Sequence, residues 1–242
     1  MATYTTEQIR NVVLLSHSGA GKTSLSEALL FTAGAISRLG RVDDGTTTSD
    51  YDPDEIKHKI SINLSLLPGI WKGTKINLMD SPGYADFVGE VMAGLRVAEG
   101  AILVVCAASG VQVGTEQAWH LLEEARLPRL ILVNRMDREN ADFYRTLEAI
   151  RARFGQRCIP LQIPIGAQQA LQGVVDLVSG KAYGPSGQEI STPPLPEATA
   201  ALKEKVMEAA AEMDDALIAK YLEGQGLTEE DLRQGLIAGI RQ

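Results

Sequence analysis

The chain has 242 residues, of which 45% are hydrophobic and 22% are charged, so it can bury the core of a globular protein. Its formal net charge of −8 disfavours a general nucleic-acid surface and free DNA as a partner. Cys106 and Cys158 show no metal-site spacing, and no stretch is long and apolar enough to span a membrane, so we expect a cytoplasmic protein without a membrane partner.

The first predicted elements are a strand and a helix joined by a turn that contains two glycines. Residues 12–15 are apolar and β-branched, residues 24–30 have a helical pattern, and the octapeptide SHSGAGKT lies between them. Glycines let backbone N–H groups approach an oxyanion, and the start of the helix adds partial positive charge. We therefore expect a phosphate-binding loop formed by Ser16, His17, Ser18, Gly19, Ala20, Gly21, Lys22, Thr23 and Ser24.

Two residues of this loop have specific expected roles. Lys22 would reach the terminal phosphates, and the Thr23 hydroxyl would bind Mg²⁺. The usual phosphate-loop pattern begins with glycine, whereas this chain has Ser16. A glycine-containing turn with a chance Gly-Lys-Thr is the structural alternative, but the flanking strand and helix favour phosphate binding.

The next segment combines a long loop with a hairpin. Residues 34–60 have little hydrophobic periodicity, and loops of that length are usually functional or disordered, which predicts a functional loop. Residues 62–71 and 74–79 are separated only by Lys72 and Gly73, which predicts a hairpin with an antiparallel strand at the sheet edge. The patterns up to Arg157 alternate between strand and helix, which predicts an α/β fold with a mostly parallel sheet flanked by helices.

A second polar motif follows the strand predicted at residues 75–79. It consists of Asp80, Ser81, Pro82, Gly83 and Tyr84. An aspartate at the carboxyl end of a strand beside the phosphate strand can hold Mg²⁺ through water. Gly83 would offer its N–H to the γ-phosphate.

A third motif follows the apolar strand at residues 130–133 and is a candidate guanine-binding element. It consists of Asn134, Arg135, Met136 and Asp137. The Asp137 carboxylate can accept hydrogen bonds from the ring N–H and the amino group of guanine, which adenine cannot offer. Asn134 can bond the base and the phosphate loop, and the Arg135 guanidinium could lie over the purine. A helix cap is the structural alternative for Asn134 and Asp137.

Together, these motifs resemble those of a translational GTPase, and most closely those of the nucleotide-binding domain of elongation factor G and its diverged paralogues. Residues 34–55, 100–119 and 162–183 are also similar to that family, the last to its inserted subdomain. The resemblance implies a P-loop GTPase fold, GTP or GDP with Mg²⁺ as cofactors, the ribosome as partner and a monomeric state. It also implies that the loop at residues 34–60 is a switch that becomes ordered with GTP and Mg²⁺, and that Ser61 approaches Mg²⁺ when GTP is bound.

The chain departs from the family at several site positions. Gly19 stands where the family has an aspartate linked to a monovalent cation, and His58-Lys59-Ile60-Ser61 replaces an Arg-Gly-Ile-Thr run. Tyr84 replaces the histidine that positions the attacking water, and Arg135 replaces a lysine. Because a phenol cannot reproduce the geometry or charge of imidazole, we expect strong GTP binding with slow hydrolysis, and the catalytic set Lys22, Gly83 and Tyr84.

The pattern changes after Arg157, which predicts two domains. Residues 1–157 would form the GTPase core, and residues 158–242 a small α+β inserted subdomain with helices at 200–213 and 228–240. We interpret residues 184–197 as a turn-rich surface loop. The family's Ser-Ala base-contacting element has no counterpart after Asp137, so we expect a fragment that lacks the last strand and helix of the core.

Three functions fit these features. The first is a ribosome-associated GTPase that resembles elongation factor G and acts in translocation or ribosome disassembly. The second is a GTP-dependent binding module without hydrolysis, which the substitutions at Tyr84 and Gly19 favour. The third is a ribosome-protection GTPase of the tetracycline-resistance type, which the form of residues 162–183 disfavours.

Overall fold

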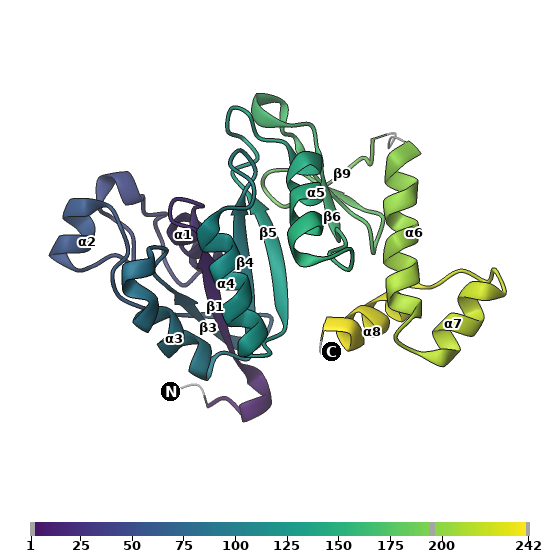
Figure 1. The fold of residues 1–242 in the computed structure, drawn as a ribbon, viewed down its shortest axis with the longest axis horizontal. Helices are drawn as coiled ribbons and strands as arrows, with labels where there is room; N and C mark the ends of the chain where they lie inside the picture. The colour runs from purple at the N-terminus through teal and green to yellow at the C-terminus, as the bar shows by residue number, and fades with distance from the viewer. Residues whose placement is uncertain (1–2, 194–196, 241–242) are drawn as a thin grey trace. The chain divides into compact units, whose positions relative to one another are not determined.

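The computed structural model describes residues 3–193 and 197–240 of the chain. Two compact units are present, Met1–Arg135 and Met136–Gln242 (Figure 1). In the described residues, no helix has both the length and the apolar character needed to cross a bilayer.

The first unit is built on a five-stranded sheet in the order β2-β3-β1-β4-β5. Its strands are β1 (Ile9–Ser16), β2 (Ser65–Trp71), β3 (Thr74–Asp80), β4 (Gly100–Cys106) and β5 (Arg129–Asn134). All neighbouring pairs are parallel except β2 and β3, which confirms the predicted antiparallel strand at the sheet edge. Lys72 and Gly73 both have positive φ values, 46° and 81°, as a tight hairpin turn requires.

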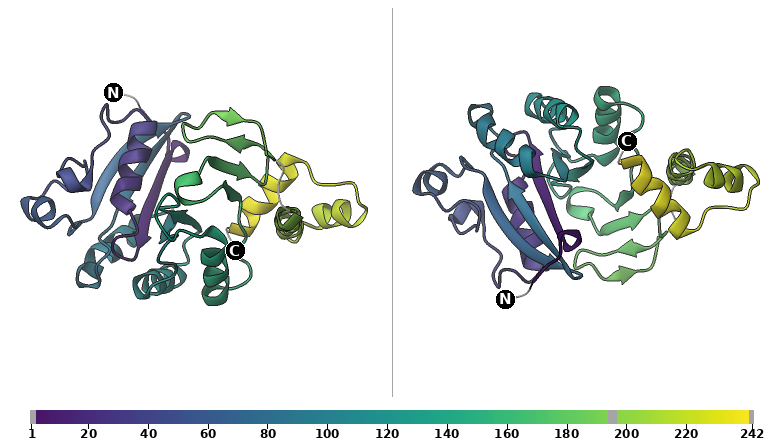
Figure 2. Two further views of the ribbon diagram at one scale, coloured as in Figure 1. Left: turned by 90° about the horizontal axis from the view of Figure 1, so that it is seen from above. Right: turned by 90° about the horizontal axis from the view of Figure 1, so that it is seen from below.

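Helices cover both faces of this sheet. They are α1 (Lys22–Thr32), α3 (Val88–Val97) and α4 (Val113–Glu124). Successive residues of β1 point to opposite faces: Leu14 packs with Leu30 of α1, whereas Val13 lies against Gly94 of α3. This three-layer arrangement, visible in Figure 2, confirms the expected mostly parallel α/β fold.

The segment predicted as a long loop, residues 34–60, has defined local structure. It contains the 3₁₀ turn η2 (Val42–Asp44) and the short helix α2 (Pro53–His58). Asp52 caps α2 by accepting a hydrogen bond from the Asp54 N–H at 2.9 Å, and Pro53 occupies the first helical position. Two further 3₁₀ turns, η1 (Thr6–Gln8) and η3 (Ala85–Phe87), complete the first unit.

The second unit combines helices with a four-stranded antiparallel sheet in the order β6-β7-β8-β9. Its elements in chain order are α5 (Phe143–Phe154), β6 (Gln162–Ile165), η4 (Gln168–Ala170), β7 (Gly173–Asp176), β8 (Ala182–Tyr183), β9 (Glu189–Ile190), α6 (Glu197–Ala211), α7 (Asp215–Leu222) and α8 (Glu229–Ile240). Leu202 and Val206 of α6 pack with Ile163 and Val175 of the sheet. This unit has the expected small α+β architecture.

Phe143 of α5 packs against the core cluster of the second unit. Two details of this unit differ from the expected organisation. Helix α7 was not predicted. The predicted surface loop at residues 184–197 includes β9, while residues 194–196 lie outside the described residues.

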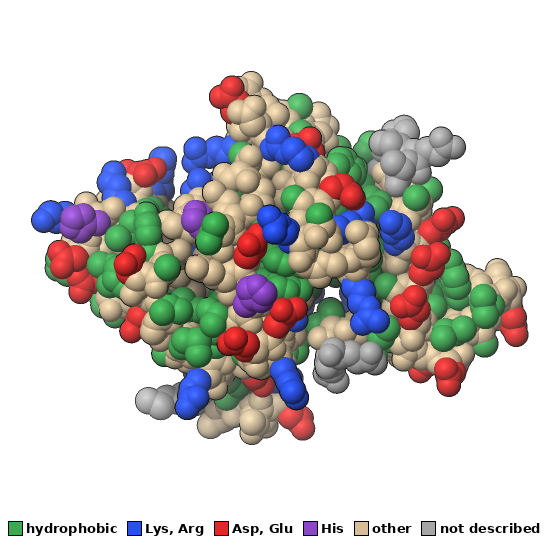
Figure 3. All heavy atoms as spheres, viewed as in Figure 1, with side chains coloured by type: hydrophobic (Ala, Val, Ile, Leu, Met, Phe, Trp, Pro, Cys, Tyr) green, Lys and Arg blue, Asp and Glu red, His purple; other side chains and the backbone are tan. Residues whose placement is uncertain are grey.

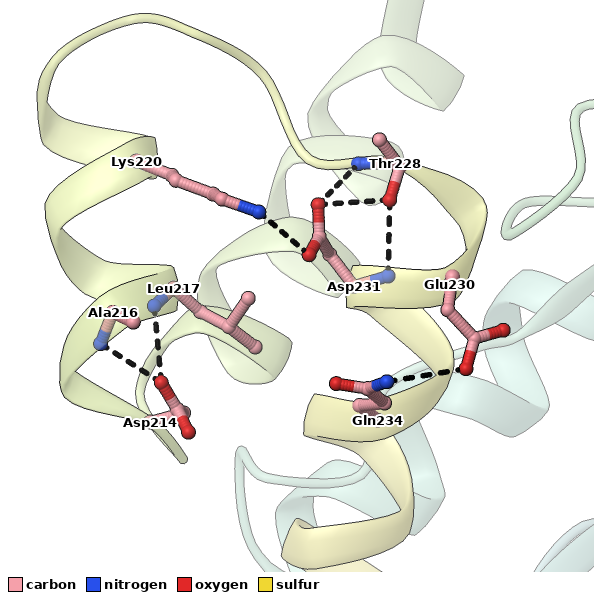
Figure 4. A network of polar contacts seen from close by, with 8 residues as sticks. All are labelled: Asp214, Ala216, Leu217, Lys220, Thr228, Glu230, Asp231 and Gln234. Atoms are coloured by element: carbon pink, nitrogen blue, oxygen red, sulfur yellow. Dashed lines mark hydrogen bonds and ion pairs between the residues drawn. The ribbon is translucent and has the colours of Figure 1, made fainter.

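The unpredicted helix α7 is joined to α8 by a polar network (Figure 4). The Lys220 Nζ lies 2.9 Å from Asp231 Oδ1, and Asp231 Oδ2 accepts hydrogen bonds from the N–H and the hydroxyl of Thr228. The hydrogen bond from Lys220 is the main reason that the pKa of Asp231 is lowered to about 2. Since folding lowers this pKa, the network stabilises the fold above the unfolded-state value near 4 and loses its contribution as the pH falls through about 2.

Helices α6 and α8 cross at a glycine, which leads to a stability prediction. A Cβ atom at Gly235 would overlap the backbone carbonyl oxygen of Ala210, which cannot move without shifting α6. We expect Gly235→Ala to lower the free energy of unfolding by about 1–3 kcal/mol in urea denaturation. Gly89→Ala in α3 is the matched control, because nothing lies within 4 Å of its added methyl group and helix propensity favours alanine. Equal stability of the two variants would contradict the close crossing.

Candidate functional site

The octapeptide forms the turn between β1 and α1, as predicted. Gly19 and Gly21 adopt positive φ values of 77° and 96°, and Gly21 caps the N-terminus of α1. Nothing lies within 4 Å of a Cβ built at Gly19, whereas a Cβ at Gly21 would lie 2.6 Å from Asn134 Nδ2. The loop is therefore open at Gly19 and closely packed at Gly21. Glycine adopts such positive φ values more readily than residues with a side chain do.

Lys22 points into the first unit rather than into solvent. Its side chain is 7% exposed, and its Nζ donates a hydrogen bond of 2.8 Å to Ser16 Oγ. Burial lowers the pKa of Lys22, and the nearby Asp80 and Asp50 carboxylates oppose this shift. The ammonium group is thus held beside two acidic groups, in a position where the partial positive charge of a helix start also attracts anions.

Asp80 is the last residue of β3, and its carboxylate is buried without a hydrogen-bond partner in the part of the chain that the structure describes. It is 1% exposed, and neither carboxylate oxygen has a hydrogen-bond partner among the described residues. Burial raises its pKa to about 6, although Lys22 and the nearby Thr23 and Ser49 hydroxyls oppose the shift. A buried carboxylate without a partner is costly, and a cation with its bound water would satisfy it. The donor set therefore fits Mg²⁺, which prefers hard oxygen ligands.

The two expected hydroxyl ligands of Mg²⁺ lie together. Thr23 Oγ1 is 3.1 Å from Ser61 Oγ, and Ser61 donates a hydrogen bond of 2.7 Å to Asp50 Oδ1. Asp50 is 4% exposed, and its burial raises its pKa. This carboxylate was missed in the sequence because it lies in an irregular segment, where spacing gives no indication of which side chains meet. No group of three or more His, Cys, Asp or Glu side chains suited to a metal occurs in residues 3–193 and 197–240.

The remaining residues of the predicted phosphate-binding loop face different parts of the first unit. His17 lies against the start of α4, since a Cβ at Gly114 would be 2.6 Å from His17 Nδ1. Ala20 is buried and Ser24 is exposed. Ser18 is close to the second motif, because a Cβ at Gly83 would lie 2.9 Å from Ser18 Cα and 2.7 Å from Lys22 Nζ.

The second motif is thus packed against the phosphate loop. Its glycine, Gly83, lies at a point where a side chain has no room. Ser81 is fully buried and donates a hydrogen bond of 2.5 Å to the Leu14 carbonyl, and Pro82 is also buried. Tyr84, in contrast, is 43% exposed and precedes η3. The backbone of the motif is fixed, while its aromatic side chain is open to solvent.

The third motif begins in the first unit and continues into the second. Asn134 donates a hydrogen bond of 2.9 Å from Nδ2 to the Ala20 carbonyl, which links the end of β5 to the phosphate loop. Arg135 has a positive φ of 59°, and its Nε lies 3.4 Å from a Cβ built at Gly21. In the second unit, the Met136 carbonyl accepts a hydrogen bond from the Gln168 N–H, and the Asp137 side chain is exposed.

Comparison with known proteins agrees with these features. Residues 7–234 match the family described as the elongation factor Tu GTP binding domain. The chain belongs to this family. It is therefore a G domain of the translational GTPase class, and the expected resemblance to the elongation factor G type is confirmed.

The chain is also similar to a protein of known structure from Thermus thermophilus. The two share 39% sequence identity with a TM-score of 0.88 over 97% of this chain. The match covers 36% of the Thermus protein, so the chain spans about a third of that relative's length. The likeness extends through both compact units and confirms the P-loop GTPase fold with an additional small subdomain.

Proposed function

We propose that this G domain binds GTP and GDP with Mg²⁺ and hydrolyses GTP within a ribosome-associated translation factor that resembles elongation factor G. The observation that carries this proposal is the unpartnered, buried Asp80 carboxylate beside Thr23 and Lys22. An acidic group kept without a partner indicates that a cation completes the site. The family of GTP-binding domains identifies the nucleotide class that such a cation would accompany.

The proposed roles follow from the chemistry of each group. The N–H groups of the phosphate loop and the Lys22 ammonium bind the phosphates, and Thr23, Ser61 and Asp80 hold the metal, Asp80 through water. Mg²⁺, when bound, would neutralise charge on the phosphate oxygens. The base would be bound by Asn134, Arg135, Met136 and Asp137, with the Asp137 carboxylate accepting the two guanine donors.

Hydrolysis requires that an attacking water be positioned beside the γ-phosphate. Gly83 would donate its N–H to that phosphate, and Lys22 would stabilise the charge that develops on it. Tyr84 is the proposed water-positioning group, and its phenol carries no positive charge near neutral pH. The phenol does not reproduce the geometry or charge of the family's imidazole, which favours slow hydrolysis and supports a GTP-dependent binding module without turnover as the second candidate function.

The wider assignments concern the whole protein. We propose that it is a cytoplasmic monomer, that the ribosome is its partner, and that it acts in translocation or ribosome disassembly. Residues 1–157 would serve as the nucleotide-binding core and residues 158–242 as the inserted subdomain. Acidic side chains are frequent over the C-terminal helices of the second unit (Figure 3), which does not favour that surface for RNA.

Replacing Tyr84 with histidine tests the proposed mechanism. We expect Tyr84→His to raise the ribosome-stimulated GTP hydrolysis rate at least about tenfold in single-turnover experiments, since a positioned general base contributes about 10²–10⁴-fold. Affinity for GTP should be unchanged. Tyr144→His in α5, where the tyrosine is 45% exposed, is the control for surface and charge effects. An unchanged rate would show that Tyr84 does not limit turnover, and absence of GTP binding by the unmodified protein would overturn the proposed function.

A further inference from the structure

The Glu27 carboxylate is a buried acidic group that the proposed mechanism does not use. Glu27 lies on α1, one turn beyond Thr23, and is 1% exposed. Its Oε2 accepts a hydrogen bond from the Gly40 N–H at 2.9 Å, and its Oε1 accepts one from the Thr48 N–H at 2.5 Å. Each carboxylate oxygen therefore bonds a different part of the segment between α1 and β2. Such charge-assisted bonds offset the cost of burying the carboxylate.

The segment is closely fitted around this carboxylate. A Cβ at Gly40 would lie 2.7 Å from Glu27 Oε2 and would overlap the Thr46 carbonyl oxygen. Gly40 is therefore held at a point where the backbone passes directly beside the acidic group. A rearrangement of residues 40–48 would break both hydrogen bonds to Glu27 and leave a buried charge without partners.

The contacts of Glu27 are part of a ring of hydrogen bonds that joins α1, residues 48–50 and Ser61 around the proposed metal ligands. Thr48 is bonded to Glu27, and Asp50, two residues later, accepts the hydrogen bond from Ser61. Ser61 in turn contacts Thr23, which is on the same helix as Glu27. This ring of hydrogen bonds begins and ends on α1. The helix that follows the phosphate loop therefore also fixes the segment that carries Ser61.

A second buried carboxylate holds the other side of Ser61. Glu55 of α2 is fully buried, and its Oε1 accepts hydrogen bonds of 2.9 Å from the N–H groups of Ile62 and Asn63. Glu27 and Glu55 thus fix the backbone on both sides of the Asp50–Ser61 pair. Neither group reaches the phosphate loop itself through a hydrogen bond among the described residues.

We propose that Glu27 is a positioning residue that holds residues 40–50 so that Asp50 and Ser61 face Thr23, and that it thereby sets the preference for GTP over GDP. The inference rests on the proposed function. GDP would be bound mainly by the phosphate loop, Lys22 and Thr23, which do not depend on the Glu27 contacts. Closure of Ser61 onto the metal of a triphosphate does depend on them, so only GTP affinity should include their free energy.

Glu27→Gln in the full-length protein tests this proposal. Glutamine has the same shape, but its NH₂ group must face one of the two N–H donors, so one bond is replaced by a donor–donor contact. We expect the affinity for a non-hydrolysable GTP analogue with Mg²⁺ to fall about tenfold, while GDP affinity changes less than about twofold, both measured by calorimetry. Amide exchange at Gly40 and Thr48 in the nucleotide-free protein should also become faster.

Glu90→Gln is the matched control. The Glu90 carboxylate accepts a single hydrogen bond of 2.8 Å from the Leu64 N–H, beyond Ser61, so this variant removes the same charge while its amide oxygen can still accept the bond. Its ratio of GTP to GDP affinity should equal that of the unmodified protein. Equal losses of GTP and GDP affinity in Glu27→Gln would overturn the inference, because that result indicates a general structural role.

A second variant keeps the test informative if Glu27→Gln does not fold. Glu55→Ala should show the same selective loss of GTP affinity, since it removes the acceptor of the Ile62 and Asn63 N–H groups next to Ser61. An unchanged ratio of GTP to GDP affinity in that variant would overturn the proposed positioning of Ser61 by these hydrogen bonds. Failure of the proposed function gives a different result, because the unmodified protein would then bind neither nucleotide.

Discussion

Replacing Lys22 with alanine is expected to abolish tight nucleotide binding. The Lys22 ammonium is the buried cation next to Asp80 and Asp50, and its bond to Ser16 holds it within the phosphate loop. Without it, phosphate oxygens would approach two buried carboxylates with one less positive charge to offset the repulsion. We expect affinity for both GTP and GDP to fall at least about 100-fold, or about 2.8 kcal/mol, in calorimetric titrations.

The control for Lys22→Ala removes the same charge elsewhere. Lys205 is exposed on α6 of the second unit, so Lys205→Ala should leave both affinities unchanged. The circular dichroism spectrum of Lys22→Ala should match that of the unmodified protein, which would show that the lost affinity is not caused by unfolding. Nucleotide affinities within about threefold of the unmodified protein would contradict the phosphate-binding role.

Asp137→Asn should change which base is bound. The carboxylate accepts hydrogen bonds only, and guanine offers a ring N–H and an amino group to it. The NH₂ group of asparagine would face one of these donors, and two donors cannot form a hydrogen bond. Xanthine has a carbonyl oxygen in place of the guanine amino group, and this oxygen can accept a hydrogen bond from the asparagine NH₂ group. We expect GTP affinity to fall about 1,000-fold and xanthosine triphosphate to become the preferred ligand in competition binding.

Asp142→Asn is the matched control for this change. Asp142 caps α5 by accepting a hydrogen bond from the Arg145 N–H, and asparagine caps helices equally well. That variant should keep its preference for GTP. If Asp137→Asn also kept it, Asp137 would not be the base-reading residue.

The sequence predicted the parts of the site that follow from regular structure. The three motifs end β1, β3 and β5, and parallel strands bring their carboxyl ends to one edge of the sheet. Strand patterns and glycine-containing turns are local signals, so Lys22, Asp80 and Asn134 could be found from spacing alone. The hairpin at Lys72 and Gly73 was predictable for the same reason.

The residues that sequence reasoning missed depend on contacts between distant segments. Asp50 meets Ser61 across 11 positions, and Glu27 bonds Thr48 across 21. An irregular segment has no period that indicates which side chains turn inward. One local signal indicated that Glu27 is buried. This acidic residue lies on the same face of α1 as the buried Thr23 and Leu30.

The hydrogen bond from Asn134 to the Ala20 carbonyl has a consequence for how affinities divide among parts of the nucleotide. One side chain serves both the end of β5 and the loop around the phosphates, so ordering either element also orders the other. The free energies of holding the base and of holding the phosphates are then not independent terms. A loss of affinity in an Asn134 variant would therefore report on the proposed base contact and the proposed phosphate contacts together.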